Sequence, residues 1–379
     1  MVWLVILGWA FLVLAVAGTL YTLLSALLAG PALRGGPVPP VRPVPVTVLK
    51  PLHGAEPGLV ENLETVLAQD YAAPVQVLFG VQDEGDPAIP LIRDLIARHP
   101  GKDLQLVVES GLHGTNRKVS NLINMAAHAR HDILVLSDSD IAVPKDWLSR
   151  VAAALSVPGV GGVTCFYSGM ALTSVWSKLS AMGISYQFLP NAIAGFRFGL
   201  ARPCFGSTIA FTRQTLERIG GFAAFASFLA DDYELGRAIR GLGLEMVLPP
   251  FTVGHLCTEA SATTLLRHEL RWNRTIRSID FAGHLGSGLT HIVALALIAA
   301  ILLGFSPISL GVLVVSIVAR FVLKAHMDRL VSAPAGPYWL LPLRDAVSFL
   351  VYLCSFFGRS VDWRGEQFVV QPSGALSQS

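Results

Sequence analysis

The sequence predicts an α/β protein with a mainly parallel mixed sheet and transmembrane helices at both ends. Between Val46 and about His255, short runs rich in Val, Ile and Leu alternate with amphipathic stretches, which is typical of parallel strands joined by helices on both faces. Hydrophobic stretches of membrane length precede and follow this region. The 379 residues are 53% hydrophobic and only 14% charged, against roughly 25% charged in an average soluble domain. We therefore expect a membrane protein carrying one soluble domain.

Charge and cysteine content exclude several other classes. The net charge of +2 gives no support for nucleic acid as a partner. The cysteines Cys165, Cys204, Cys257 and Cys354 lie far apart, so they predict neither a zinc site nor a disulfide framework.

The N-terminal stretch predicts a transmembrane helix over residues 1–30. Val2–Ala29 carries no charged side chain, and a helix of this length exceeds the hydrocarbon core of roughly 30 Å. No positively charged segment precedes it, as a signal peptide would require. Arg34, Arg42 and Lys50 follow it, so the positive-inside rule places the next domain in the cytoplasm. The proline-rich residues 31–45 predict a stiff linker.

The region 46–258 predicts the soluble, cytoplasmic α/β domain. The expected strands are Val44–Leu49, Val75–Val81, Leu104–Val108, Asp132–Ser137, Gly161–Tyr167, Thr208–Thr212 and Glu245–Leu248. The expected helices are Leu59–Gln69, Ala88–His99, Lys118–Ala129 and Asp146–Leu155. Ligands of such sheets bind at the carboxyl ends of the strands, where Asp83 and Asp138–Asp140 fall.

Residues 259–283 predict an amphipathic helix lying on the membrane surface. One face would carry Leu265, Trp272, Ile276 and Ile279, and the other Arg267, Arg271 and Arg274. We expect the apolar face to rest in the membrane interface. The alternative is an ordinary amphipathic helix of the soluble domain.

Residues 284–358 predict the C-terminal membrane segments. Leu285–Leu323 has the length of two helices, with a break near Ser306-Pro307. Pro337–Phe357 is interrupted by Arg344 and Asp345, so it predicts either a third span or a re-entrant segment. In the tail, residues 359–379, Arg359 and Arg364 favour a cytoplasmic C-terminus.

Two carboxylates follow a predicted buried strand directly. Asp138 and Asp140 come after Asp132–Ser137, where they could bind a hard divalent cation, Mg²⁺ or Mn²⁺, that bridges phosphate oxygens. An enzyme using a nucleotide diphosphate-sugar requires such a site. A polar turn after a buried strand is the equally weighted alternative.

Other polar groups have a functional and a structural interpretation. Asp83 could contact a nucleoside or cap a turn. Lys118 at a helix start could bind phosphate or be a solvated cation. Asp231 and Asp232 could supply a general base or simply favour a helix N-terminus. Near the end of the predicted soluble region, Arg271 could neutralise a leaving diphosphate, and Trp272 could lie beside an acceptor. His268 precedes both residues in the sequence.

Together these motifs resemble the family 2-like processive and lipid-acceptor glycosyltransferases, and most closely the ceramide glucosyltransferase family. The matching stretches are Val48–Gly54, Asn62–Thr65, Val81–Asp83, Asp86–Ile89, Asn116–Leu122, Gly220–Phe222, Ala230–Tyr233 and Trp363-Arg364. A narrower similarity exists to the bacterial hopanoid-biosynthesis-associated branch. It rests on Arg117–Leu122, Leu200–Gly206 and Arg267–Trp272.

The resemblance implies a GT-A type domain that transfers glucose or N-acetylglucosamine from a UDP-sugar, with inversion, to a lipid hydroxyl. The acceptor would be a hopanoid or ceramide, or diacylglycerol, and the enzyme would face the cytoplasm from a bacterial inner membrane. One departure is His268, where the family usually has Gln or Arg. The rival functions are a processive polysaccharide synthase and a membrane-anchored binding protein with a degenerate transferase domain.

The implied residue roles follow the motifs position by position. Asp83 would contact uridine, Asp138 and Asp140 the diphosphate and the divalent cation, and Lys118 the phosphates. Asp232 is the preferred general base and Asp231 the second choice. Arg271 and Trp272 would contact the donor, and Trp272 with His268 the acceptor.

Overall fold

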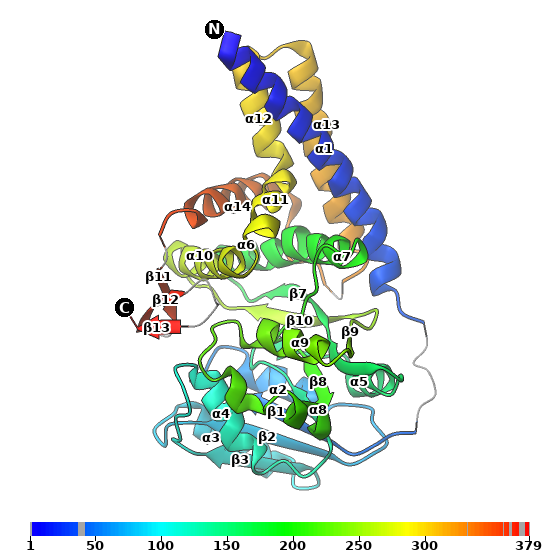
Figure 1. Cartoon of the computed structure of the whole chain (residues 1–379), viewed down its shortest axis with the longest axis vertical. Helices are drawn as coiled ribbons and strands as arrows, with labels where there is room; N and C mark the ends of the chain where they lie inside the picture. The colour runs from blue at the N-terminus through cyan, green and yellow to red at the C-terminus, as the bar shows by residue number, and fades with distance from the viewer. Residues whose placement is uncertain are drawn as a thin grey trace.

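In the computed structural model, an α/β domain lies beneath a group of helices that project from one side of it (Figure 1). The structure describes residues 2–36, 42–331, 333–358, 360–363, 366–370 and 376–378. Arg359 and Arg364, whose charges favour a cytoplasmic C-terminus, lie outside the described residues, as does part of the predicted linker.

The main sheet has seven strands in the order β3-β2-β1-β4-β8-β6-β9. Their bounds are β1 Val46–Pro51, β2 Val75–Val81, β3 Asp103–Val108, β4 Ile133–Leu136, β6 Val160–Thr164, β8 Ile209–Thr212 and β9 Glu245–Val247. The strands from β3 to β4 run parallel, β8 is antiparallel to both of its neighbours, and β9 is parallel to β6. The predicted mainly parallel mixed sheet is confirmed.

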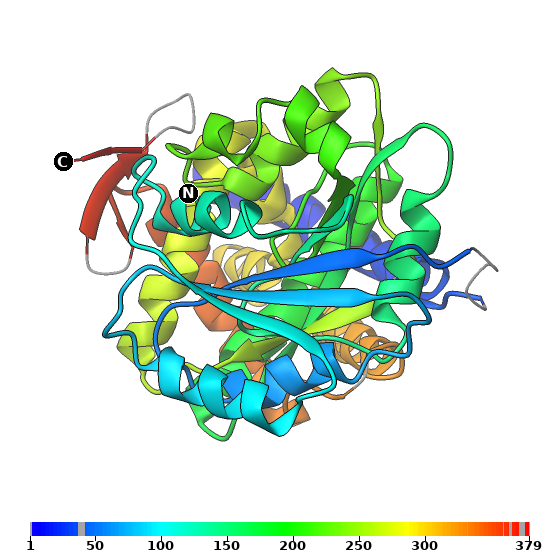
Figure 2. The same cartoon turned by 90° about the horizontal axis from the view of Figure 1, so that it is seen from below.

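Helices cover both faces of this sheet, as the view from below shows (Figure 2). Successive residues of β1 point to opposite faces: Val48 packs with Leu63 and Ile92, whereas Leu49 packs with Leu122. The surrounding helices are α2 Leu59–Leu67, α3 Ala88–Arg98, α4 Arg117–Ala126, α5 Trp147–Leu155, α8 Arg213–Arg218, η2 Phe222–Phe225 and α9 Asp231–Gly241.

A second, smaller sheet was not anticipated as a unit. It has the order β5-β10-β7, with β5 Ile141–Ala142, β7 Phe166–Ala171 and β10 Thr252–Cys257. A strand of two residues carries no periodic signal, and Gly254 and His255 interrupt the apolar pattern of β10. Because β5 follows the Asp138–Asp140 turn, its pairing with β10 brings residues from the end of the domain beside that turn.

A layer of helices separates the α/β domain from the projecting helices (Figure 1). It contains α6 Val175–Gly183, the π-turn η1 Ile184–Phe188, α7 Leu189–Arg197, α10 Ala262–Ile279 and α14 Leu341–Ser355, with η4 Tyr338–Leu340 before it. Helix α10 lies within the predicted residues 259–283 and begins at Ala262 because Ser261 caps it, its Oγ accepting from the Thr264 amide at 3.2 Å. Leu265 is buried in the domain core. The expectation that it rests in the membrane interface is therefore wrong.

Among the described residues, two helices are long and apolar enough to cross a membrane: α1 Val2–Leu33 and α13 Pro307–Met327. A third candidate is formed by α11 Phe281–Ser287, η3 Gly288–Thr290 and α12 Ile292–Leu302, which bend by 66°. The predicted break near Ser306-Pro307 is confirmed, because Ser306 caps α13 and Pro307 begins it. Small residues let α1 approach its neighbours closely; a Cβ on Gly18 would lie 2.1 Å from the Leu289 carbonyl oxygen.

Helix α14 has a polar face that packs against the rest of the protein and an apolar face that is exposed. Leu343, Leu350 and Leu353 are exposed, whereas Arg344 is buried and Asp345 partly buried. The C-terminal strands β11 Ser360–Trp363, β12 Glu366–Val370 and β13 Leu376–Gln378 follow it. The charges that interrupt the predicted apolar stretch thus point into the protein.

Both charges of α14 form buried ion pairs. Arg344 pairs with Glu269 of α10 and donates to the Leu179 carbonyl of α6 at 3.1 Å. Asp345 accepts from Arg320 of α13 at 2.7 and 2.9 Å, and Arg320 also donates to the Tyr186 carbonyl of η1 at 2.8 Å. These contacts attach α10 and η1 to the membrane helices.

We predict that Arg344→Met lowers the free energy of unfolding by about 3–5 kcal/mol, because it leaves the Glu269 carboxylate buried without a partner. The double variant Arg344→Met/Glu269→Leu should recover most of this loss. The measurement is urea unfolding of the detergent-solubilised protein. The control is Arg98→Met, which removes an exposed pair with Glu64 and should cost no more than about 1 kcal/mol. Equal losses in the two single variants would contradict the prediction.

Candidate active site

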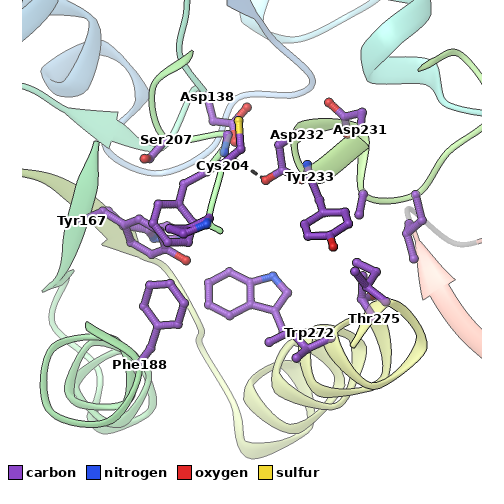
Figure 3. Close-up of a pocket in the computed structure, with 18 of the residues that line it drawn as sticks. Asp138, Tyr167, Phe188, Cys204, Ser207, Asp231, Asp232, Tyr233, Trp272 and Thr275 are labelled. Carbon is purple, nitrogen blue, oxygen red and sulfur yellow. Dashed lines mark hydrogen bonds between the residues drawn. The ribbon is translucent and has the colours of Figure 1, made fainter. Parts of the chain in front are cut away.

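A cavity of about 1160 Å³ lies where the carboxyl ends of β1 and β4 face α9 and α10. Figure 3 shows side chains directed into this cavity from opposite walls, with Asp232 on one wall and Trp272 on the other. The predicted residues Lys118, Asp138, Asp140, Asp231, Asp232, His268, Arg271 and Trp272 all line it. Segments far apart in the sequence therefore meet at one site, at the strand ends where ligands of parallel sheets bind.

A buried lysine holds the turn that presents Asp138 and Asp140. Lys50, the next-to-last residue of the apolar strand β1, is fully buried. Its Nζ donates to Ser137 Oγ at 3.1 Å and to the Asp138 carbonyl at 2.7 Å. Burial lowers the pKa of Lys50 to about 8, against the opposing effect of Asp140 and Asp138. The cation beneath the turn fixes its backbone and partly neutralises the two carboxylates above it.

Asp140 faces a histidine that sequence reasoning missed. His255 Nε2 lies 3.4 Å from Asp140 Oδ2. Burial alone would lower the pKa of His255, but the Asp140 carboxylate raises it to about 10. Asp140 Oδ1 and His255 Nδ1 are both buried without a hydrogen-bond partner. Each of these two side chains therefore has one polar atom that faces its neighbour and one that is left without a partner.

Lys118 lies between two of the predicted carboxylates. Its Nζ is 2.6 Å from Asp138 Oδ1 and 3.8 Å from Asp231 Oδ2. Asn116 caps α4 by accepting from the Val119 amide at 3.0 Å, and its side-chain amide donates to Asp231 Oδ1 at 3.2 Å. Both carboxylate oxygens of Asp231 are therefore directed toward α4.

Asp232 has a different environment from its neighbour. Its carboxylate accepts from the Gly206 amide at 3.0 Å and from the Tyr233 amide at 2.8 Å. Burial and the adjacent Asp231 raise the pKa of Asp232 to about 6. Figure 3 shows this carboxylate directed into the cavity, with the Trp272 indole rising from α10 on the opposite wall. A carboxylate with this pKa can accept a proton near neutral pH.

Aromatic rings form the wall of the cavity nearest the membrane helices. Tyr167 and Phe188 stack with centroids 4.9 Å apart, and Phe205 contacts both rings edge-on. Trp272 packs edge-on against His268 at 4.4 Å. Such rings provide a flat apolar surface for a sugar face or a lipid body.

His268 is held by a buried acid. Its Nδ1 lies 2.7 Å from Glu259 Oε1, which also accepts from Ser180 Oγ at 3.0 Å. Burial would raise the pKa of Glu259, but the hydrogen bonds to its carboxylate, from His268 and Ser180 among others, together with the charge of His268, lower the pKa overall. Glu259 therefore fixes the orientation of the His268 ring.

Asp83 does not line the cavity. It is exposed, and its carboxylate accepts from the Gly85 amide at 2.8 Å within its own turn. The buried acid nearby is Asp86, which accepts from the Gly54 amide at 3.0 Å and from the Ala88 amide at 2.8 Å. Asp86 thus joins the loop after β1 to the start of α3.

No group of three His, Cys, Asp or Glu side chains within the described residues is arranged to hold a metal ion. Asp138 and Asp140 nevertheless both supply carboxylate groups to the cavity. Of the residues missed from sequence, Lys50 had a usable signal, because a charged residue directly after the predicted strand Val44–Leu49 needs a partner if that end of the strand is buried.

The family model of glycosyl transferase family 21 matches residues 9–376. Ceramide glucosyltransferase 1 of Caenorhabditis elegans is 24% identical over 230 residues, covering 58% of this chain and 47% of that protein. The ceramide glucosyltransferase of Candida albicans is 34% identical over 122 residues, covering 29% of this chain and 22% of that protein. The chain therefore spans half or less of these relatives. An N-acetylglucosaminyltransferase of Azorhizobium caulinodans is 23% identical over 331 residues, covering 76% of this chain and 82% of that protein.

Among solved structures, the mannosyltransferase PcManGT from Pyrobaculum calidifontis, in complex with GDP-Man and Mn²⁺, has a similar fold. The TM-score is 0.51 at 21% sequence identity, over 93% of this chain and 99% of that one. The likeness supports the GT-A type architecture expected from the sequence.

We predict that Lys50→Met loosens the Asp138–Asp140 turn, because the carbonyl and hydroxyl groups beneath it lose their donor. Local stability should fall by about 1–3 kcal/mol, so the turn amides should exchange hydrogen about 10- to 100-fold faster. Hydrogen-exchange mass spectrometry of residues 137–142 measures this. Lys102→Met, at an exposed position, is the control. Unchanged exchange in Lys50→Met would show that the turn is held by other contacts.

Proposed function

The chain belongs to glycosyl transferase family 21, and from this membership and the geometry of the cavity we propose that it glycosylates a membrane lipid. The donor would be UDP-glucose or UDP-N-acetylglucosamine, and the acceptor a hydroxyl of a hopanoid or ceramide. The observation that carries the proposal is the meeting of Asp138, Asp140 and Asp232 in one cavity whose far wall is Trp272 on α10. The setting would be the cytoplasmic face of a bacterial inner membrane.

The residues around Asp140 fit a divalent cation. Asp140 Oδ1 is buried without a partner, and Mg²⁺ and Mn²⁺ prefer carboxylate oxygen ligands. Asp138 and Asp140 would hold the ion. When bound, it would neutralise charge developing on the diphosphate.

The chain's own cations would bind the rest of the donor. Lys118 and Arg271 both line the cavity and would contact the phosphates. The uridine would extend toward the carboxyl ends of β1 and β2, where Asp83 follows β2. Trp272 would contact the sugar and, with His268, the acceptor.

Asp232 would act as the general base. The acceptor oxygen would bond to the anomeric carbon while the bond from that carbon to the diphosphate oxygen breaks, which inverts the configuration. The hydroxyl proton would pass to the Asp232 carboxylate. Asp231, whose oxygens face Asn116 and Lys118, would position Lys118 and is the second choice as base.

We predict that transfer depends on a divalent cation and on Asp140. The assay is the full chain in nanodiscs, with each UDP-sugar offered against ceramide and against a hopanoid alcohol. Chelator should abolish transfer, Mg²⁺ or Mn²⁺ should restore it, and Asp140→Ala should remove most of it with the fold intact. Full activity in excess chelator would refute cation dependence, and no transfer from any UDP-sugar would refute the function.

We predict that Asp232→Asn lowers kcat about 10²-fold or more with little change in UDP binding, because the amide cannot accept the proton. In the wild type the raised pKa means that Asp232 is protonated, and inactive as a base, below about pH 6. Activity should therefore rise with pH through about 6 and then level. A fully active Asp232→Asn beside an inactive Asp231→Asn would reverse the assignment of the base.

We predict that the acceptor stays in the leaflet and meets the site beside α10. Exposing its apolar body to water would cost about 25 cal/mol per Å², and Ile276 and Ile279 line the cavity on that side. Ile276→Asp or Ile279→Asp should weaken transfer to acceptor in bilayers far more than UDP-sugar binding. Leu112→Asp, at an exposed position outside the cavity lining, is the control. Wild-type transfer by the Ile variants would show that the acceptor takes another route.

A further inference from the structure

The cavity has a second end that the proposed transfer reaction does not use. Asp232, Tyr233, Arg237 and Arg240 lie along one side of α9 and all line the cavity. At 1.5 Å per residue, Arg240 is about 12 Å along the helix from Asp232. Lys118, which pairs with Asp138, meets Asp231 at the N-terminal end of α9, whereas Arg237 and Arg240 lie toward the C-terminal end of that helix.

Three arginines gather at this end. Arg202, from the loop after α7, lines the cavity together with Arg237 and Arg240. Arg237 pairs with Glu234, one helical turn earlier. No carboxylate of the described residues pairs with Arg202 or Arg240. Even with Glu234 counted, the cluster carries an excess of two positive charges.

Arg240 is the least satisfied of the three. Its Nη1 is buried and has no hydrogen-bond partner. Burial, together with the nearby charge of Arg202, lowers the pKa of Arg240. A guanidinium that is partly removed from water beside another cation is unfavourable unless an anion completes the site.

We propose that Arg202, Arg237 and Arg240 form an anion-binding subsite for a phosphate or carboxylate group. The planar guanidinium presents paired N–H donors that match the oxygens of these groups. The anion could be free, or it could be the headgroup of an acidic lipid. Phe198 and Leu200, which precede Arg202, are exposed apolar side chains that would contact the hydrocarbon part of such a lipid.

The test measures binding without any sugar donor. Inorganic phosphate and dihexanoylphosphatidylglycerol, below its micellar concentration, are titrated by calorimetry into the purified full chain. We expect saturable binding of at least one, weakened tenfold or more in Arg240→Gln and in Arg202→Gln, because each loses a charge-assisted contact. Arg93→Gln, at an exposed position on α3, should bind as the wild type does.

The two probes separate the two sources of the anion. Binding of both indicates a site for a simple anion, and binding of the lipid alone indicates a headgroup site. If phosphate binds only near Lys118, its affinity will be the same in Arg240→Gln as in the wild type. No binding of either probe, or equal binding by wild type and both variants, would overturn the proposal. Because no transfer is measured, this result is independent of the proposed enzymatic function.

Discussion

The cavity depends on two buried ion pairs made by adjacent residues of α14. Arg344 holds Glu269 of α10, and Asp345 holds Arg320 of α13. Arg271 and Trp272 lie less than one helical turn after Glu269, and Phe188 ends the π-turn whose Tyr186 carbonyl Arg320 contacts. The membrane-side wall of the cavity is therefore in place only when the membrane helices are docked. Removing one partner of such a pair leaves an uncompensated buried charge.

This arrangement gives the cavity two chemically different sides. The side built on β1 and β4 carries acids held by Lys50 and Lys118. The side built on η1 and α10 carries aromatic rings. Under the proposed function, the first side would bind the water-soluble donor and the second would face the lipid. Asp232 lies where the two meet, and its raised pKa follows from the same burial.

Much of this could be predicted from the sequence. Strands β1 to β4 and helices α2 to α5 follow local hydrophobic periods, and the motif residues around Asp138 and Asp232 follow them at fixed positions. Other features depend on contacts between distant segments. His255 reaches Asp140 only because β10 pairs with β5, and Glu259 reaches His268 only across the turn before α10. Leu265 was misjudged because a helical wheel gives an apolar face but not what that face packs against. Arg344 and Asp345 were visible as interruptions, but their partners lie in two other helices.

The central claim is that this chain adds a sugar to a membrane lipid. Comparing the total lipids of a deletion strain with those of its parent by mass spectrometry tests it most directly. The account predicts that one glycosylated lipid class disappears and that its unglycosylated alcohol accumulates. The wild-type gene should restore the parent profile, and a gene carrying Asp232→Asn should not. Identical lipid profiles in the two strains, under conditions in which the parent expresses the protein, would contradict the claim.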